Sequence, residues 1–170
     1  DAFRDRLDSC YKKITDPGFK DWSGSGSGNL SDYIEVPEEH KFDGFDGYKK
    51  VIPLCDVVVI ATPPGFRPMH FEAAVDAGKH VFMEKPLAVD APGIRRILAA
   101  AEKAKQKKLN VVVGLQRHYQ KKYQEWVEML QAGVIGDIVT SHVYWNSGGV
   151  WVRPRQDGQT EMEYQMRNWY

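Results

Sequence analysis

The sequence predicts an α/β fold built on part of a doubly wound parallel sheet. Three short apolar runs, at residues 56–61, 80–83 and 110–114, have the length and composition of strands. Patterns with helical spacing fill the intervals between them, and the links are only a few residues long. Alternating strands and helices with short links form right-handed βαβ crossovers, which place the strands parallel to one another in one sheet.

The composition is that of an ordinary globular protein. The 170 residues include 23 basic and 23 acidic side chains, and 42% are hydrophobic. The length suits one domain, or one domain and part of a second. A net charge of zero gives no overall attraction to nucleic acid or to a membrane surface. The longest run without Asp, Glu, Lys or Arg, at 138–152, is shorter than the roughly 20 apolar residues of a membrane-spanning helix. We therefore expect no nucleic-acid partner and no membrane partner.

The N-terminal part predicts one helix and a flexible loop. Apolar residues spaced by three and four predict a helix over 2–14, which Pro17-Gly18 ends. The serine–glycine repeat at 23–28 superficially resembles a phosphate-binding loop, but no helix pattern follows it, so we reject that interpretation. Cys10 and Cys55 are too few for a disulfide framework or a four-cysteine zinc site, and we expect no metal centre.

From residue 56 onward, each predicted element has clear boundaries. Residues 56–61 are apolar at nearly every position, which is typical of a strand covered on both faces. The helix expected over 67–77 ends before Gly78, a residue suited to the left-handed C-terminal cap. After the second strand, Asp90 is placed to cap a further helix that has Pro92 in its first turn. A last helix is expected at 120–132.

Residues 95–123 carry nine basic side chains and a single acid, Glu102. Such a block can bind a polyanion. Four of its lysines, however, lie near the expected end of an amphipathic helix, where cations interact favourably with the helix dipole. We therefore interpret the block as a solvated helix face and keep the polyanion site as the alternative.

Ligands of parallel sheets bind beyond the carboxyl ends of the strands, and three loops lie there. The loop after the first strand contains Thr62, Pro63, Pro64 and Arg67, with His70 just beyond; the second contains Glu84-Lys85-Pro86; the third contains Gln116-Arg117-His118-Tyr119. A lysine at the mouth of an apolar sheet is partly desolvated, so that its pKa can fall and it can polarise a hydroxyl. The alternative is a surface Lys–Glu pair at the end of a strand.

The whole segment 56–86, DVVVIATPPGFRPMHFEAAVDAGKHVFMEKP, closely resembles the glucose–fructose oxidoreductase, inositol dehydrogenase and rhizopine-catabolism family of NAD(P)-dependent oxidoreductases. The matching motifs are ATPP at 61–64, His70, AGKHV at 77–81 and EKP at 84–86, and GVIGDI at 133–138 resembles the segment that enters the family's second domain. The resemblance implies a Rossmann domain that binds NAD or NADP, here residues 1–118. It also implies the start of a second, α+β substrate and dimerisation domain at 119–170.

The resemblance also implies roles for individual residues. Lys85 would be catalytic, because it would bond the reacting hydroxyl of the substrate. The implied cofactor contacts are Asp1, Thr62, Pro63, Pro64, His70, Glu84, Lys85, Gln116 and Arg117. No G-x-G-x-x-G turn precedes a helix in this chain, and the proton-accepting histidine of the family does not stand in the expected motif. We therefore expect an internal fragment that is inactive or nearly so by itself.

The expected activity is hydride transfer between a hydroxyl of a sugar or cyclitol and NAD or NADP. Expected substrate contacts are Lys85, Arg117, Trp151 and Arg153, since aromatic rings and guanidinium groups suit a sugar, although the C-terminal aromatic residues can equally serve packing. The alternatives are a glycoside hydrolase that uses NAD for transient oxidation and a non-catalytic regulator that binds nucleotide or sugar. The resemblance further implies a homo-oligomer formed through the sheet of the second domain, of which residues 138–146 would be one strand. The compartment, cytoplasm or periplasm, stays open.

Overall fold

The computed structural model describes residues 1–16 and 30–169, so the serine–glycine repeat lies outside the described residues. The chain forms two compact units, Asp1–Gly114 and Leu115–Tyr170, and each is described here by itself. Within residues 1–16 and 30–169, no helix is both long and apolar enough to cross a membrane. The α+β domain expected from residue 119 onward stays a prediction.

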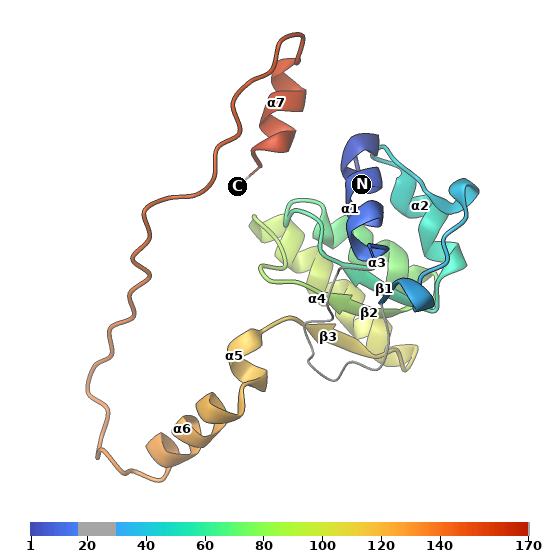
Figure 1. Cartoon of the computed structure of the whole chain (residues 1–170). Coiled ribbons are helices and arrows are strands. Elements are labelled where there is room, and N and C mark those ends of the chain that lie inside the picture. Colours follow the sequence, from blue (N-terminus) through green and yellow to red (C-terminus); the bar gives the residue numbers. More distant parts are fainter. Residues whose placement is uncertain (17–29, 170) are drawn as a thin grey trace. The chain divides into compact units, whose positions relative to one another are not determined.

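The first unit contains the predicted parallel sheet (Figure 1). Its strands lie in the order β1–β2–β3, and both pairs are parallel, with Ile60 opposite Met83 and Met83 opposite Val113. The elements in chain order are α1 (Arg4–Ile14), α2 (Gly47–Val51), β1 (Val57–Ile60), α3 (Arg67–Asp76), β2 (His80–Met83), α4 (Ala91–Gln106) and β3 (Val111–Val113), with short 3-10 turns at Leu30–Tyr33, Glu38–His40 and Ile52–Leu54. The α/β class and the order of strands and helices from β1 to β3 are as the sequence predicts, whereas α2 was not predicted.

The ends of the helices follow the predicted local chemistry. The Asp90 side chain accepts a hydrogen bond from the Gly93 amide, 2.6 Å away, and so caps α4. Gly78 has a φ of +72°, a left-handed conformation that lets the chain turn from α3 into β2. Asp90 thus fixes where α4 begins, and Gly78 fixes where the chain leaves α3 on its way to β2.

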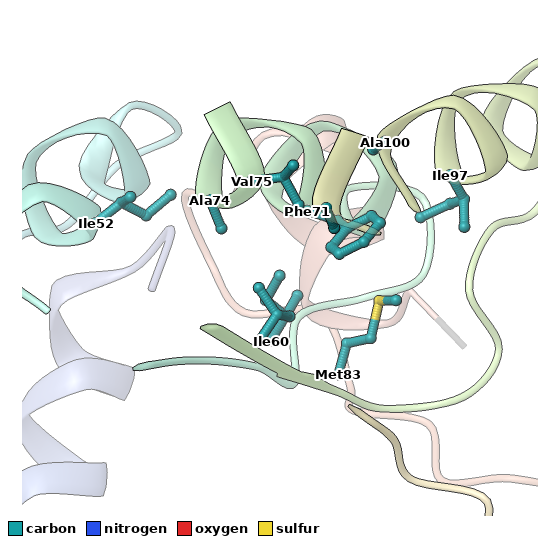
Figure 2. Close-up of a cluster of buried hydrophobic side chains, with 10 residues drawn as sticks. Ile52, Ile60, Phe71, Ala74, Val75, Met83, Ile97 and Ala100 are labelled. Atoms are coloured by element: carbon teal, nitrogen blue, oxygen red, sulfur yellow. The ribbon is translucent and has the colours of Figure 1, made fainter. Parts of the chain in front are cut away.

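One face of the sheet carries the core of the unit. Ile60 and Met83 point from the sheet toward Phe71 of α3 and Ile97 of α4, and all four side chains are at most 4% exposed (Figure 2). Burying such side chains is the main favourable contribution to folding, about 1.5–3 kcal/mol for each large one. Helices α3 and α4 therefore hold β1 and β2 in place, and with them the loops that follow these strands.

The opposite face of the sheet is exposed, which corrects the expectation that the first strand is covered on both faces. Val57, Val59, Phe82 and Val112 are between 36% and 67% exposed. Successive side chains of a strand point to opposite faces, and α3 and α4 pack against only one of them. An apolar run therefore does not by itself reveal which of its faces is covered within this unit.

Three of the basic residues at 95–123 link α4 to α3 through hydrogen bonds or ion pairs. The Lys103 ammonium lies 2.7 Å from the Asp76 carboxylate, and Arg96 pairs with Glu72. Lys107 donates to the main-chain oxygens of Val75 and Asp76, 2.9 and 2.8 Å away, at the carboxyl end of α3. These contacts agree with the interpretation of the block as a helix face, because cations and helix C-termini attract each other.

The second unit contains α5 (Gln116–Tyr119), α6 (Lys121–Gln131) and α7 (Glu161–Arg167). Helix α6 confirms the helix expected at 120–132. The strand expected at 138–146 is not formed, and this is a correction. A strand requires a partner for its main-chain groups, and residues 115–169 contain no other strand that could supply one.

Candidate functional site at the carboxyl edge of the sheet

The carboxyl ends of the three strands lie at one edge of the first unit, together with the loops that follow β1 and β2. The Glu84 amide donates to the Ile60 oxygen over 3.0 Å, and the Gly114 amide donates to the Met83 oxygen over 2.8 Å. These two bonds extend the parallel ladder by one residue past β2 and β3. Lys85 is the next residue after Glu84, so it stands at the rim of the sheet on the central strand.

Glu84 lies directly against Gly114. A Cβ atom added to Gly114 would come within 2.7 Å of Glu84 Oε1 and 2.9 Å of its carboxyl carbon. Only a residue without a side chain therefore leaves the Glu84 carboxylate where it is. The half-buried Glu84 is thereby held beside the end of β3, with its acceptor oxygens at the sheet edge.

Lys85 is exposed in the first unit. The sequence-based expectation of a partly desolvated lysine is therefore wrong for this unit. The physical reason is that Lys85 follows Glu84, the last residue of this strand to join the ladder, and so lies past the end of the sheet. The Lys85–Pro86 peptide bond is cis.

Thr62 and His70 are joined across the loop that follows β1. Thr62 Oγ1 and His70 Nδ1 are 3.0 Å apart, within hydrogen-bond distance, and the His70 ring lies 4.6 Å from the ring of Tyr48 between centroids. Burial lowers the pKa of His70, and the positive charge of the nearby amino terminus lowers it further. His70 is therefore neutral at physiological pH, and it fixes the hydroxyl of Thr62.

The predicted residues Pro63 and Pro64 form the half-buried turn between Thr62 and α3, in which the Phe66 amide donates to the Pro63 oxygen over 3.0 Å. The Asp1 carboxylate accepts from the Phe3 amide over 3.0 Å at the start of α1. The predicted ribose contact of Asp1 stays a prediction.

Arg67 is a residue of this edge to which the sequence analysis gave no role. Its side chain is buried and donates to main-chain oxygens in the loops after both β1 and β2. Burial lowers the pKa of Arg67, and the Glu84 charge opposes this effect. The signal available in the sequence was an arginine in the first turn of a helix, where the helix dipole disfavours a cation.

The remaining predicted residues belong to the second unit. Gln116 and Arg117 open α5, and the Arg117 guanidinium lies 4.8 Å from the centre of the Tyr123 ring. The Arg153 guanidinium lies 5.0 Å from the Trp151 ring, whose centroid is 6.4 Å from that of Trp169. These contacts show that the Trp151–Arg153 pair takes part in packing within its own unit. The substrate contacts of Arg117, Trp151 and Arg153 stay predictions.

A parallel sheet joined by helical crossovers, with polar and charged residues at its carboxyl edge, is part of an α/β protein of the class that binds ligands beyond the carboxyl ends of its strands. Residues 27–115 match the model of an oxidoreductase family with an NAD-binding Rossmann fold. The chain belongs to this family, and the resemblance stated from the sequence motifs is confirmed.

Among its relatives, the chain is 37% identical over 120 residues to an inositol 2-dehydrogenase of Serratia proteamaculans, covering 67% of this chain and 34% of that protein. It is 40% identical over 87 residues to inositol 2-dehydrogenase 3 of Saccharopolyspora erythraea, covering 51% and 25%. A putative oxidoreductase from Parabacteroides merdae has the same fold, with a TM-score of 0.57 at 18% identity, covering 72% of this chain and 26% of that one. The chain thus spans about a quarter to a third of the length of these relatives.

Proposed function

We propose that the protein is an NAD(P)-dependent oxidoreductase that transfers a hydride between a secondary hydroxyl of a sugar or cyclitol and the nicotinamide. Membership of an NAD-binding oxidoreductase family supports the reaction class. The names of the inositol 2-dehydrogenases among the relatives support a cyclitol or a similar polyol as substrate. The observation that carries the proposal is the position of Glu84 and Lys85 at the carboxyl edge of the central strand, beside Thr62 and Gly114.

The residues at this edge fit a nicotinamide nucleotide. A ribose offers hydroxyls that both donate and accept, while the Glu84 carboxylate only accepts and the Lys85 ammonium only donates. Because Gly114 has no side chain, the Glu84 carboxylate has room beside the end of β3 at the sheet edge. In this proposal Glu84 and Lys85 hold the ribose of the nicotinamide, and Thr62, Pro63, Pro64 and His70 form the wall on the side of β1, with further contacts from Asp1, Gln116 and Arg117.

NAD or NADP supplies the hydride acceptor when bound. Lys85 has a second role in the proposal, because its ammonium group also donates a hydrogen bond to the substrate hydroxyl. The hydroxyl proton passes to a base that is not one of the residues named above, and the substrate oxygen gains negative charge as the proton leaves. A fixed ammonium group stabilises this charge more strongly than it stabilises the neutral hydroxyl, and this difference lowers the barrier. Arg117, Trp151 and Arg153 are proposed to contact the rest of the polyol.

The test uses the full-length protein with NAD or NADP and a panel of inositols and sugars, followed by the absorbance of the reduced cofactor. Lys85→Ala should lower turnover by at least about 100-fold, the usual effect of removing one donor that stabilises negative charge developing on an oxygen. Lys105→Ala, on the exposed side of α4, is the matched control and should leave turnover unchanged. Unchanged turnover in Lys85→Ala would refute the role of Lys85.

The same assay separates the alternative functions. A dehydrogenase accumulates reduced cofactor, whereas a glycoside hydrolase that oxidises its substrate transiently releases sugar without net reduction of NAD. A regulator binds the nucleotide or the sugar without turnover of either. We further propose that the 170-residue chain alone turns over slowly or not at all, and that the complete protein is a homo-oligomer formed through its second domain.

A further inference from the structure

Arg67 is the first residue of α3, and its side chain lies inside the first unit. It is 4% exposed and is the one buried charged or polar residue within the described part of the chain. Its Nε donates to the Thr62 oxygen over 2.7 Å. One terminal nitrogen donates to the Glu84 oxygen over 3.0 Å and to the Pro86 oxygen as well.

Stabilisation of the helix does not explain this arrangement. A cation at the N-terminus of a helix is opposed by the helix dipole. Ion pairing does not explain it either, because within residues 1–16 and 30–169 no carboxylate lies within salt-bridge distance of Arg67. A buried charge needs compensation, and here three main-chain oxygens supply it. The buried guanidinium group is therefore held by main-chain oxygens and not by the helix or by a carboxylate.

The three oxygens come from the two loops that carry the proposed chemistry. The Thr62 oxygen belongs to the loop after β1, and the oxygens of Glu84 and Pro86 belong to the loop after β2. The residues Glu84 and Pro86 are the two neighbours of Lys85 in the chain. One guanidinium group thus fixes the main chain on both sides of Lys85 and ties it to Thr62.

We propose that Arg67 is a positioning residue that sets the main chain of Lys85 relative to the loop at Thr62. This inference rests on the proposed function, in which Lys85 bonds the reacting hydroxyl. The guanidinium group is planar and presents its donors in a rigid fork, so a single side chain can hold three acceptors in fixed directions. A lysine at this position keeps the charge, but its ammonium sits at the end of a flexible stem and cannot reproduce the fork.

The test compares Arg67→Lys with the unchanged full-length protein, using two measurements. In steady-state kinetics, kcat should fall about 100-fold, the usual effect of misplacing a reacting group by about 1 Å, while KM for the polyol changes much less. In hydrogen–deuterium exchange without cofactor, the amides of the non-proline residues in 62–66 and in 84–88 should exchange faster, and those in the middle of α4 should not.

Arg96→Lys is the matched control, because Arg96 is more exposed and pairs with the Glu72 carboxylate, to which a lysine can also bind. It should change neither kcat nor exchange at the two loops. Arg67→Gln serves as a second variant that keeps hydrogen-bond donors and loses the charge, and it should show the same two effects as Arg67→Lys. A protein that fails to fold with either Arg67 variant would make Arg67 a structural residue and overturn the proposal.

Two further results would overturn the inference. Unchanged exchange at both loops would show that Arg67 does not fix their main chain. Faster exchange with an unchanged kcat would show that the hydrogen bonds of Arg67 to the loops do not affect catalysis. Absence of turnover in the unmodified protein with every polyol is a different result, because it refutes the proposed function. The exchange measurement, which needs no cofactor, still reports in that case whether Arg67 links the loops.

Discussion

The contact between Glu84 and Gly114 can be tested by adding one methyl group at the sheet edge. In Gly114→Ala, the new Cβ would lie 2.7 Å from Glu84 Oε1, whereas ordinary contact begins near 3.4 Å. The carboxylate must therefore retreat by about 0.7 Å, the difference between these two distances. The carboxylate is the end of a flexible side chain, so we expect the shift to change the free energy of unfolding by less than about 1 kcal/mol.

The displaced carboxylate should bind the nucleotide more weakly. A hydrogen bond to a charged group contributes about 1.5–3 kcal/mol. At 1.4 kcal/mol for each factor of ten, its loss raises the Kd for NAD or NADP about 10- to 150-fold. The assay is a calorimetric titration of the full-length protein with each nucleotide, accompanied by thermal unfolding to confirm that stability is nearly unchanged.

A double-mutant cycle separates this mechanism from a general disturbance. Gly114→Ala acts through Glu84, so adding it to Glu84→Ala should weaken nucleotide binding no further. Gly148→Ala is the control, since a Cβ at Gly148 would meet no atom within 4 Å. Full additivity of the two changes, or an unchanged Kd in Gly114→Ala, would refute the reasoning.

Three further predictions concern the fold of the first unit, and each is measured by thermal or denaturant unfolding. The pKa of His70 in the folded state is below the unfolded value of about 6.5, so the unfolded state binds more protons near that pH. The free energy of unfolding should therefore fall as the pH drops below about 6.5, and His70→Asn should weaken this pH dependence. An equal pH dependence in the variant would contradict the prediction. Phe71→Ala should cost about 3–5 kcal/mol because the ring is fully buried between the sheet and α4; a loss below 1 kcal/mol would show that the core is not packed as described. Asp90→Ala should cost about 1 kcal/mol because the Gly93 amide loses its acceptor, and Asp90→Ser should restore most of it.

Several features of the fold could be predicted because they depend on residues close together in the sequence. The strands at β1, β2 and β3 follow from short apolar runs, and the order of strands and helices follows from the spacing between them. The caps at Gly78 and Asp90 follow from the conformational freedom of glycine and from a side-chain oxygen at a helix start. Parallel strands place their carboxyl ends at one edge, so the position of Lys85 at the rim was also predictable.

Other features were decided only by the tertiary structure, because they depend on how segments far apart in the sequence approach each other. An apolar strand does not reveal which face its helices cover, and so the exposure of Val59 and Phe82 was not foreseen. The contact of Glu84 with Gly114 requires the register of β2 and β3. The three acceptors of Arg67 lie as many as 19 positions away along the chain, and only the packing of α3 against the sheet directs its side chain toward them.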